Sequence, residues 1–252
     1  MAILVFDSGI GGLGVVAALN QLAPSLPLSY LADNGFFPYG EKPDEILLPH
    51  ILRVIGEAIA REQPEAVVIA CNTASTIALA ALREAFPLPF IGCVPPIKPA
   101  AAASRTRCIG VLATAATVRR PYLNGLIETF APDCAVLTLG TPHLAELAEQ
   151  KFRGATVDVS EAAAPLFAQP GGNAIDSVAL GCTHYTFLLP EFLALWPSIS
   201  WHDPAFPVAK QTLKIIEPLG LSQAPRTARF TGDILAPDLL VPFGLEPDFN
   251  PA

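Results

Sequence analysis

The sequence predicts an α/β protein in which parallel sheets carry helices on both faces and the chain forms two lobes. Short apolar runs rich in β-branched residues alternate with segments of helical periodicity, and short turns join them. About nine such runs are present, which favours two lobes over one. The strand–turn–helix pattern around Cys71 returns around Cys182, about 110 residues later, so we expect an internal repeat.

The predicted strands are apolar runs that end at Gly, Pro or polar residues. After the first of them, Gly9, Gly11 and Gly12 permit a tight turn into a helix. In chain order the predicted strands are Ile3–Asp7, Leu28–Asp33, Ala66–Cys71, Pro89–Cys93, Arg107–Thr114, Ala135–Gly140, Ser177–Cys182, Ser198–His202 and Thr227–Asp233.

The predicted helices carry apolar residues three and four positions apart, and prolines or glycines mark their ends. In chain order they are Leu13–Leu22, Asp44–Glu62, Thr73–Phe86, Ala115–Phe130, His143–Lys151, Val157–Ala168, Tyr185–Leu195 and Pro207–Ile216. The Pro-rich segment 94–104 is interpreted as a crossing between the lobes, and a Pro-rich tail follows the last strand.

Composition and charge exclude several classes of function. The formal net charge is -8 and no Lys/Arg-rich run occurs, so nucleic acid is not expected as the main ligand. The longest apolar region, Ala66–Leu82, is interrupted by Asn72 and Thr73, whereas a membrane-spanning helix needs about 20 mostly apolar residues. We therefore expect no membrane partner. The N-terminus has no basic leader region, which favours a cytoplasmic protein.

The five cysteines do not form a disulfide or zinc pattern. Their number is odd, and neither a CxxC pair nor a Cys/His cluster is present. We expect free thiols in a reducing cytosol and no metal site. Cys93, Cys108 and Cys134 are interpreted as packing residues, because free cysteine is among the most buried residue types.

Candidate site residues follow the predicted strands, because ligands of parallel α/β sheets bind at the carboxyl ends of strands. Two of these ends carry a cysteine directly before a helix. A helix N-terminus favours a thiolate and lowers the pKa of such a thiol from about 8.5. The polar strand ends are Asp7–Ser8, Cys71–Thr73, Thr114 and Cys182–His184.

Two such thiols leave three chemical alternatives. A redox disulfide usually uses a close pair such as CxxC, which is absent. A Cys–His nucleophile would use Cys182 with His184 and leave Cys71 unexplained. In two-base proton transfer, one thiolate removes a proton from a carbon and the opposite thiol delivers one to the other face. Of the three, only this last reaction requires the duplication.

Five motifs now identify a resemblance. In chain order they are DSGIGG (Asp7–Gly12), PYG (Pro38–Gly40), CNTAS (Cys71–Ser75), GVLAT with the threonine after it (Gly110–Thr117) and GCTHY (Gly181–Tyr185). As a set they resemble the glutamate racemases of the cofactor-independent aspartate/glutamate racemase superfamily. The resemblance spans nearly the whole chain, with the motifs in order and suitably spaced.

The resemblance implies an α/β fold of two flavodoxin-like, three-layer lobes with mainly parallel sheets, related by pseudo-twofold symmetry. The first lobe would comprise residues 1–93 plus 204–252, and the second residues 94–203. The active site would lie in the cleft between them. The implied activity is racemisation of L- and D-glutamate without a cofactor, which supplies D-glutamate for peptidoglycan.

The resemblance also implies the roles of individual residues. Cys71 would take the α-proton from D-glutamate and Cys182 from L-glutamate, while Asp7 and His184 would assist them. Glu149 falls where the family has a supporting acid. The substrate's carboxylates and ammonium would be held by Asp7, Ser8, Tyr39, Gly40, Asn72, Thr73, Thr114, Thr117, Thr183 and His184.

Other interpretations remain open at this point. An aspartate or hydantoin racemase, a one-cysteine decarboxylase and a non-catalytic amino-acid-binding protein could share this scaffold. Retention of both cysteines disfavours the decarboxylase, and PYG with GCTHY favours glutamate over aspartate. A pyridoxal phosphate enzyme would need a Schiff-base lysine, and no lysine lies at a strand end. We also expect a homodimer.

Overall fold

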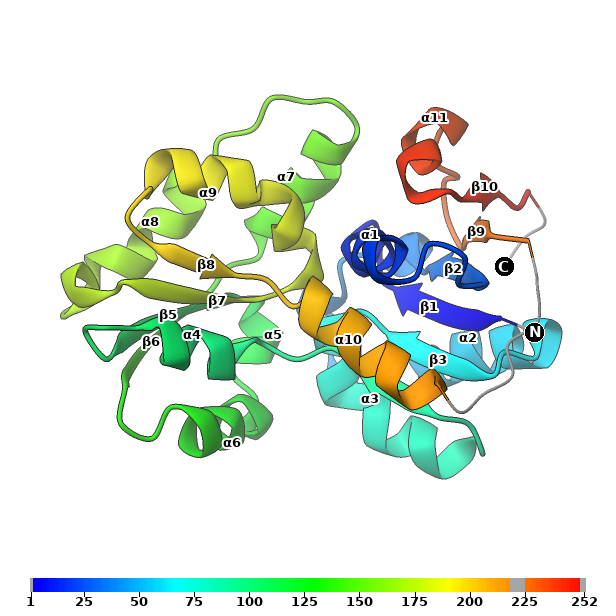
Figure 1. Ribbon diagram of the computed structural model, residues 1–252, viewed down its shortest axis with the longest axis horizontal. Helices are drawn as coiled ribbons and strands as arrows, with labels where there is room; N and C mark the ends of the chain where they lie inside the picture. Colours follow the sequence, from blue (N-terminus) through cyan, green and yellow to red (C-terminus); the bar gives the residue numbers. More distant parts are fainter. Residues whose placement is uncertain (1, 218–224, 250–252) are drawn as a thin grey trace. The chain divides into compact units, whose positions relative to one another are not determined.

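The computed structural model describes residues 2–217 and 225–249. The contacts between Cα atoms divide the chain into two compact units. The first unit contains the residues up to Cys93 together with those from Ala205, and the second contains Val94–Pro204. Each unit is built around one sheet (Figure 1).

The sheet of the first unit has six strands in the order β10-β9-β2-β1-β3-β4, and all its pairings are parallel. The central strand β1 is buried along its whole length, as expected for a strand covered on both faces. The strands are β1 (Ile3–Asp7), β2 (Leu28–Ala32), β3 (Ala66–Ile69), β4 (Phe90–Gly92), β9 (Thr227–Phe230) and β10 (Glu246–Pro247).

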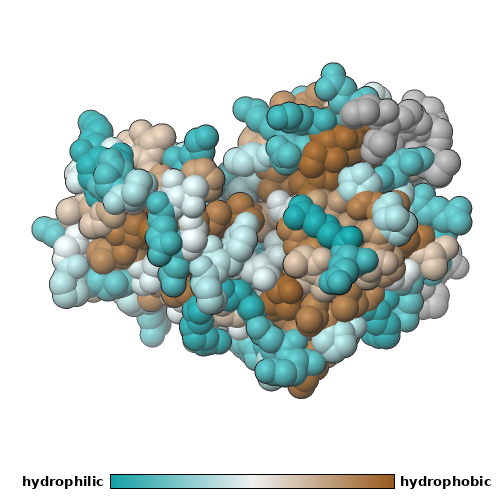
Figure 2. Space-filling model, turned by 90° about the horizontal axis from the view of Figure 1, so that it is seen from below, coloured by the Kyte–Doolittle hydropathy of each residue, from teal (hydrophilic) through white to brown (hydrophobic). Residues whose placement is uncertain are grey.

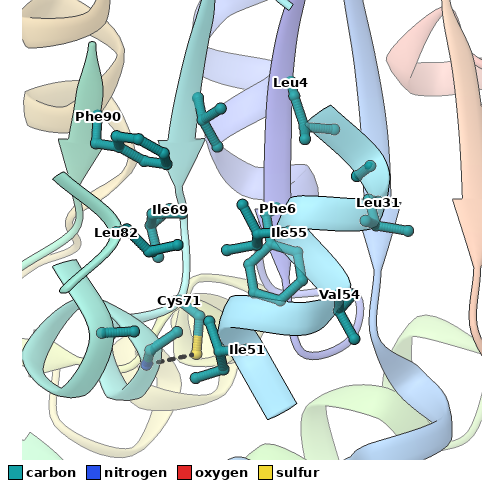
Figure 3. Packing of buried hydrophobic residues seen from close by; sticks show 14 of the residues in the cluster. Leu4, Phe6, Leu31, Ile51, Val54, Ile55, Ile69, Cys71, Leu82 and Phe90 are labelled. Atoms are coloured by element: carbon teal, nitrogen blue, oxygen red, sulfur yellow. Dashed lines mark hydrogen bonds between the residues drawn. The ribbon is translucent and has the colours of Figure 1, made fainter. Parts of the chain in front are cut away.

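Helices cover both faces of this sheet. α2 (Asp44–Glu62) and α3 (Asn72–Ala85) pack on one face and share a core with β1, β2 and β3. Figure 3 shows that core, in which Leu4 and Phe6 point toward α2 and Cys71 lies at its edge. α1 (Leu13–Leu22) and α10 (Ala205–Ile216) pack on one another at the other face (Figure 1).

The second unit has a four-stranded parallel sheet in the order β6-β5-β7-β8. Its strands are β5 (Cys108–Ala113), β6 (Ala135–Gly140), β7 (Ser177–Gly181) and β8 (Ser200–His202). α4 (Ile97–Ala103) and α6 (Pro121–Phe130) share a core with one face, while α8 (Ser160–Ala168) packs on the other at Gly110. α7 (His143–Phe152) packs on the 3₁₀ helix η4 (Thr183–Leu188).

The two sheets share one topology. The order β2-β1-β3-β4 in the first sheet corresponds to β6-β5-β7-β8 in the second, so that in each unit the first strand lies between the second and the third. Cys71 follows the third strand of its sheet, and Cys182 follows the third strand of the other. The predicted α/β class with parallel sheets is therefore confirmed.

Three predicted helices differ from the structure. The helix predicted over Ala115–Phe130 is two helices, α5 (Ala115–Val118) and α6, because Arg120 before Pro121 is extended at φ -85° and ψ 137°. The predicted helix Tyr185–Leu195 is the 3₁₀ helix η4 followed by α9 (Leu189–Leu195). The helix predicted from Val157 begins only at Ser160, because Asp158 accepts the Ser160 N–H in a turn.

Short elements were also missed in the Pro-rich segments. The crossing segment contains α4, and the tail contains α11 (Pro237–Leu240), the 3₁₀ helix η5 (Val241–Phe243) and β10. Among residues 2–217 and 225–249 the strands therefore number ten rather than nine. Two 3₁₀ turns, η1 (Asn34–Phe36) and η2 (Tyr39–Glu41), occupy the loop after β2, and η3 (Gly172–Ala174) precedes β7.

The surface shows no extended apolar band on the face drawn in Figure 2, where apolar residues form separate groups bordered by polar ones. Within the described ranges, no helix is both long enough and apolar enough to cross a membrane.

Gly12 provides a test of how tightly the first unit packs at the turn after β1. A Cβ at this position would lie 2.8 Å from Asp7 Cβ, 3.0 Å from Tyr30 Cε2 and 3.1 Å from Ala70 Cβ. We expect Gly12→Ala to lower the free energy of unfolding by about 1–3 kcal/mol, measured by urea denaturation. The control Gly125→Ala, at an exposed helical position with nothing within 4 Å, should raise it by up to about 1 kcal/mol. Equal stability of both variants would contradict this packing.

Candidate active site

The carboxyl ends of β1, β2 and β3 place three polar side chains at one edge of the first sheet. β1 and β2 pair so that Asp7 is level with Ala32, and Asp33 N–H donates to Asp7 O at 2.8 Å. On the other side Ala70 N–H donates to Phe6 O at 2.8 Å, which carries β3 as far as Cys71. Asp7 therefore ends β1, and Asp33 and Cys71 follow the ends of its two neighbours, β2 and β3.

Cys71 is the N-cap residue of α3. Its backbone is extended, at φ -93° and ψ 123°, and the Ala74 N–H donates to Sγ over an N···S distance of 3.5 Å (Figure 3). Ser8 Oγ lies 3.6 Å from the same sulfur. The thiol is 5% exposed. A negative sulfur at this position is stabilised by the helix N-terminus and by these two donors.

Asp7 and Ser8 lie in the turn that follows β1. Asp7 is fully buried, and one of its carboxylate oxygens accepts the Gly9 N–H at 2.8 Å. Tyr30 Oη donates to Gly9 O at 2.5 Å and holds the same turn from β2. These bonds fix the backbone of the turn beside Cys71.

Asn72 and Thr73 form the first turn of α3. Both are buried, at 1% and 3% exposure. The amide nitrogen Nδ2 of Asn72 is buried and has no hydrogen-bond partner. A buried amide N–H without a partner costs about 1–3 kcal/mol, so this group is available for a ligand.

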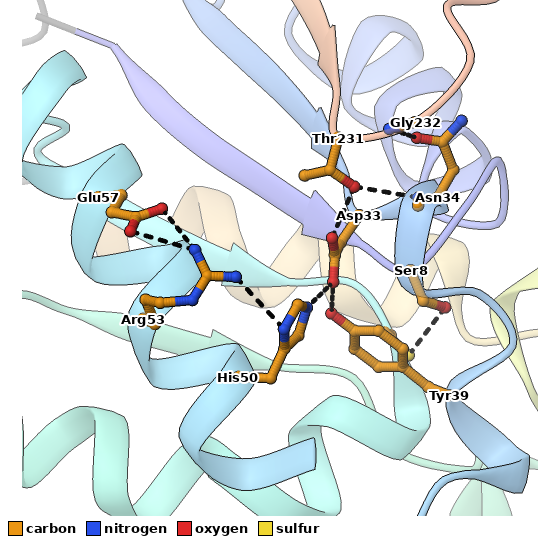
Figure 4. A network of polar contacts seen from close by, with 11 residues as sticks. Ser8, Asp33, Asn34, Tyr39, His50, Arg53, Glu57, Thr231 and Gly232 are labelled. Carbon is orange, nitrogen blue, oxygen red and sulfur yellow. Dashed lines mark hydrogen bonds and ion pairs between the residues drawn. The ribbon is translucent and has the colours of Figure 1, made fainter. Parts of the chain in front are cut away.

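Tyr39 is bound to Asp33. Its hydroxyl donates to Asp33 Oδ2, while His50 Nε2 lies 2.5 Å from that oxygen and Thr231 Oγ1 donates to Oδ1 at 2.6 Å (Figure 4). Burial, followed by the Asp33 carboxylate, raises the pKa of Tyr39 far above its ordinary value, so the hydroxyl keeps its proton. Toward a ligand, that oxygen can act only as an acceptor. Gly40 follows Tyr39 within η2.

The second unit gathers Cys182, His184 and Glu149. Cys182 Sγ lies 4.0 Å from His184 Nδ1, and His184 Nε2 lies 3.2 Å from Glu149 Oε1. His184 is 2% exposed, and Arg153 Nη2 lies 3.5 Å from the other oxygen of Glu149. Because the carboxylate accepts from Nε2, a neutral His184 presents the lone pair of Nδ1 to the thiol.

Three threonines complete the strand ends of the second sheet. Thr114 follows β5 and caps α5, where its Oγ1 accepts the Thr117 N–H at 3.2 Å and lies 3.0 Å from Thr117 Oγ1. Thr183 follows Cys182 and is 2% exposed. These hydroxyls offer donors and acceptors at the same sheet edge as Cys182.

The two cysteines have different surroundings. Cys71 is the N-cap of the 14-residue helix α3, and its sulfur accepts the Ala74 N–H. Cys182 is the N-cap of the 3₁₀ helix η4, and its side chain makes no cap hydrogen bond. The expectation that both thiols face an α-helix N-terminus is therefore wrong for Cys182, where a His–Glu pair stands instead. Burial, followed by Cys182, raises the pKa of the neighbouring Tyr185, which donates to Thr141 O at 3.3 Å.

The predicted residues thus form two sets, one in each unit. The first set is Asp7, Ser8, Tyr39, Gly40, Asn72, Cys71 and Thr73; the second is Thr114, Thr117, Glu149, Cys182, Thr183 and His184. That the two sets enclose one substrate stays a prediction. Among the residues that the structure describes, no group of three or more His, Cys, Asp or Glu side chains could hold a metal ion.

Sequence reasoning missed Asp33, which accepts the Tyr39 hydroxyl, and also His50 and Thr231, which contact the Asp33 carboxylate. Asp33 follows the end of β2 as Asp7 ends β1, so the rule that found Asp7 applies to it as well. Nothing local in the sequence links His50 to a carboxylate that precedes it in another element. Thr231 directly follows β9, which comes after the second unit in the chain, and donates to Asp33 from there.

Removal of the Tyr39 hydroxyl tests the Asp33 network. Tyr39→Phe leaves the Asp33 carboxylate without one of its donors, so we expect the free energy of unfolding to fall by about 1–3 kcal/mol at pH 7. In the unfolded chain tyrosine ionises near pH 10, whereas folded Tyr39 keeps its proton. Wild-type stability should therefore decline above about pH 10, by about 1.4 kcal/mol per pH unit for this group.

The decline should be weaker in Tyr39→Phe, although Tyr185 contributes to it in both proteins. The exposed Tyr122 gives the control, and Tyr122→Phe should change neither the stability at pH 7 nor the alkaline slope. Urea denaturation at pH 7 to 11 measures both quantities. An unchanged stability of Tyr39→Phe at pH 7 would rule out a stabilising role for the Tyr39–Asp33 bond.

Comparison with known proteins shows which family this chain resembles. Residues 14–197 match the family model described as Asp/Glu/Hydantoin racemase. The glutamate racemase of Granulibacter bethesdensis is 52% identical over 214 residues, which are 84% of this chain and 78% of that protein. The glutamate racemase of Brucella anthropi is 46% identical over 222 residues, 86% of this chain and 80% of that one.

A solved structure agrees with the sequence relatives. The Escherichia coli glutamate racemase, in complex with L-glutamate and the activator UDP-MurNAc-ala, superposes with a TM-score of 0.87 at 35% identity. The match covers 98% of this chain and 96% of the E. coli chain. The chain belongs to the Asp/Glu/hydantoin racemase family, and within it to the glutamate racemases.

Proposed function

We propose that this protein interconverts L- and D-glutamate by proton transfer between two thiols. The observation that carries the proposal is the pair Cys71 and Cys182, each following the third strand of its sheet and each beside groups able to manage a thiol proton. The relatives named glutamate racemase support glutamate as the substrate, and the E. coli structure was solved with L-glutamate.

The reaction needs no oxidant or reductant. One cysteine, as thiolate, takes the proton from the α-carbon and becomes a thiol, while the electron pair of the broken C–H bond stays on the substrate. The other cysteine, as thiol, delivers its proton to the opposite face of that carbon and becomes a thiolate. From L-glutamate Cys182 would take the proton and Cys71 would deliver one, and from D-glutamate the roles are exchanged.

The surroundings of each thiol suit these steps differently. Cys71 as thiolate is stabilised by the Ala74 N–H, the Ser8 hydroxyl and the N-terminus of α3. His184 can accept the Cys182 proton at Nδ1, because Glu149 holds Nε2. Asp7 would assist on the Cys71 side.

The substrate is a zwitterion with two carboxylates, and the proposed binding residues offer matching donors. Asn72 Nδ2 is a buried donor without a partner, and Ser8, Thr73, Thr114, Thr117 and Thr183 supply hydroxyls. The proposal places Tyr39 and Gly40 beside the substrate through ring and backbone.

The wider role follows from the same proposal. Proton transfer between thiols needs no cofactor, and D-glutamate would serve peptidoglycan synthesis. The five cysteines are free, which is consistent with a reducing cytoplasm. A homodimer is part of the proposal, and its mass in solution would test it.

Deuterium exchange tests the reaction directly. In D2O with L- or D-glutamate, we expect the wild-type protein to place deuterium at the α-carbon of the product, while the remaining substrate keeps its proton. This pattern follows because the base on the product side carries solvent deuterium. Proton NMR follows the α-signal and circular dichroism follows the optical signal, with L-aspartate run in parallel.

The cysteine variants test the mechanism in the same assay. Cys71→Ser and Cys182→Ser should each lose racemisation by about 10²-fold or more, because each removes one proton-transfer group. Absence of α-deuteration with either enantiomer would refute the racemase proposal. Activity unchanged in both variants would refute the two-thiol mechanism alone, and faster turnover of aspartate would assign the protein to the other amino acid.

Glu149 gives a test of the His184 arrangement. In Glu149→Gln the shape is kept but the charge that holds His184 Nε2–H is lost, so we expect kcat to fall on the order of 10-fold. Because the two enantiomers have equal free energy, kcat/KM must fall equally in both directions. The exposed Glu146 on the same helix is the matched control, and Glu146→Gln should leave kcat unchanged. Equal kcat for the Glu149 variant and wild type would exclude Glu149 from the proton path.

A further inference from the structure

We propose that Cys93 is a positioning residue, whose thiol orients the Asn72 amide so that its NH2 group faces a carboxylate of the substrate. Cys93 comes at the end of β4 and is fully buried. Its thiol donates to Asn72 Oδ1 over an S···O distance of 3.4 Å. This inference rests on the proposed racemase function and adds to it a residue outside the five motifs named in the sequence analysis.

The approach of β4 to α3 makes this contact possible. Gly92 directly precedes Cys93, and a Cβ there would lie 2.6 Å from Leu79 Cδ2 of α3. The absence of a side chain at Gly92 therefore lets the end of β4 lie close against the first turns of α3. At this distance the short Cys93 side chain reaches the first residue of the helix.

Ser75 fixes the backbone of Cys93 against the same helix. Cys93 N–H donates to Ser75 Oγ at 2.8 Å, and Ser75 Oγ donates to Ile69 O at 2.9 Å. One hydroxyl thus links the ends of β3 and β4 to the first turn of α3. The position of the Cys93 thiol is set by this backbone link and not by packing alone.

The two ends of the Asn72 amide are in different states. Oδ1 accepts the Cys93 thiol, while Nδ2 is buried without a partner. A buried donor left unpaired destabilises a protein, so its retention points to a ligand group that accepts from it. Asn72 adjoins Cys71 in sequence, which places that acceptor beside the proton-transfer thiol.

Orientation decides whether Asn72 attracts or repels the substrate. With NH2 toward the ligand the amide donates to a carboxylate oxygen. Rotated by half a turn it would present its own oxygen to that carboxylate, which is unfavourable. A donor on Oδ1 favours the first orientation, and the Cys93 thiol is such a donor.

Steady-state kinetics with L- and D-glutamate test this role. Cys93→Ala removes the donor, and we expect KM to rise about 5-fold with kcat within about twofold of wild type. Cys93→Ser keeps a hydroxyl donor and should restore KM. A partly unfolded preparation lowers the apparent kcat but not KM, so KM reports the orientation even if the variants lose stability.

Two further variants separate orientation from packing. In the Asn72→Ala background, Cys93→Ala should raise KM no further, because the group it orients is gone. Cys108→Ala removes another buried thiol, 3.7 Å from Gly171 O in the second unit, and should leave KM unchanged.

The outcomes are distinct. An unchanged KM in Cys93→Ala, or a KM raised equally in Cys93→Ala and Cys93→Ser, overturns the positioning role while the racemase proposal stands. The same holds if Cys93→Ala raises KM in the Asn72→Ala background. Failure of the wild-type protein to exchange the α-proton of glutamate overturns the proposed function, and this inference with it.

Discussion

The candidate site depends on the parallel direction of the strands. Every pairing in both sheets is parallel, so within each unit the carboxyl ends of all strands lie at one edge. Backbone bonds continue past the strands, from Asp33 N to Asp7 O and from Thr141 N to Ala113 O. Residues distant in sequence thereby become neighbours through the backbone alone, and the side chains then determine the chemistry.

The repeated topology carries two different solutions for handling a thiol proton. Cys71 relies on fixed dipoles, with a helix N-terminus and a serine hydroxyl around the sulfur. Cys182 relies on a titratable side chain, with His184 held by Glu149. The first arrangement favours the thiolate and the second offers a place for its proton. In two-base transfer one cysteine is a thiolate while the other is a thiol, so different surroundings of the two sulfurs are compatible with the proposed chemistry.

Patterns that depend on neighbours in sequence were predicted well. The strand-end cysteines, the parallel sheets implied by the alternation of strands and helices, and the helix Asp44–Glu62 all follow from periodicity and turn residues. Contacts between distant elements were not predictable in this way. The Asp33 carboxylate accepts hydrogen bonds from Tyr39, His50 and Thr231, which belong to three other segments. The break before Pro121, in contrast, is local, because proline disfavours helical backbone angles at the residue before it. The sequence also does not show that the helix after Cys182 is a 3₁₀ helix, in which the Cys182 side chain makes no cap hydrogen bond.

The order of the strands along the chain also bears on synthesis of the protein. α10, β9 and β10 belong to the first unit, yet they are translated after the whole of the second. Until Thr227–Phe230 leaves the ribosome, the edge of β2 lacks its parallel partner, and Asp33 lacks Thr231. An open strand edge is a template for pairing with another chain. The first unit therefore presents an unpaired strand edge for the time needed to translate the second.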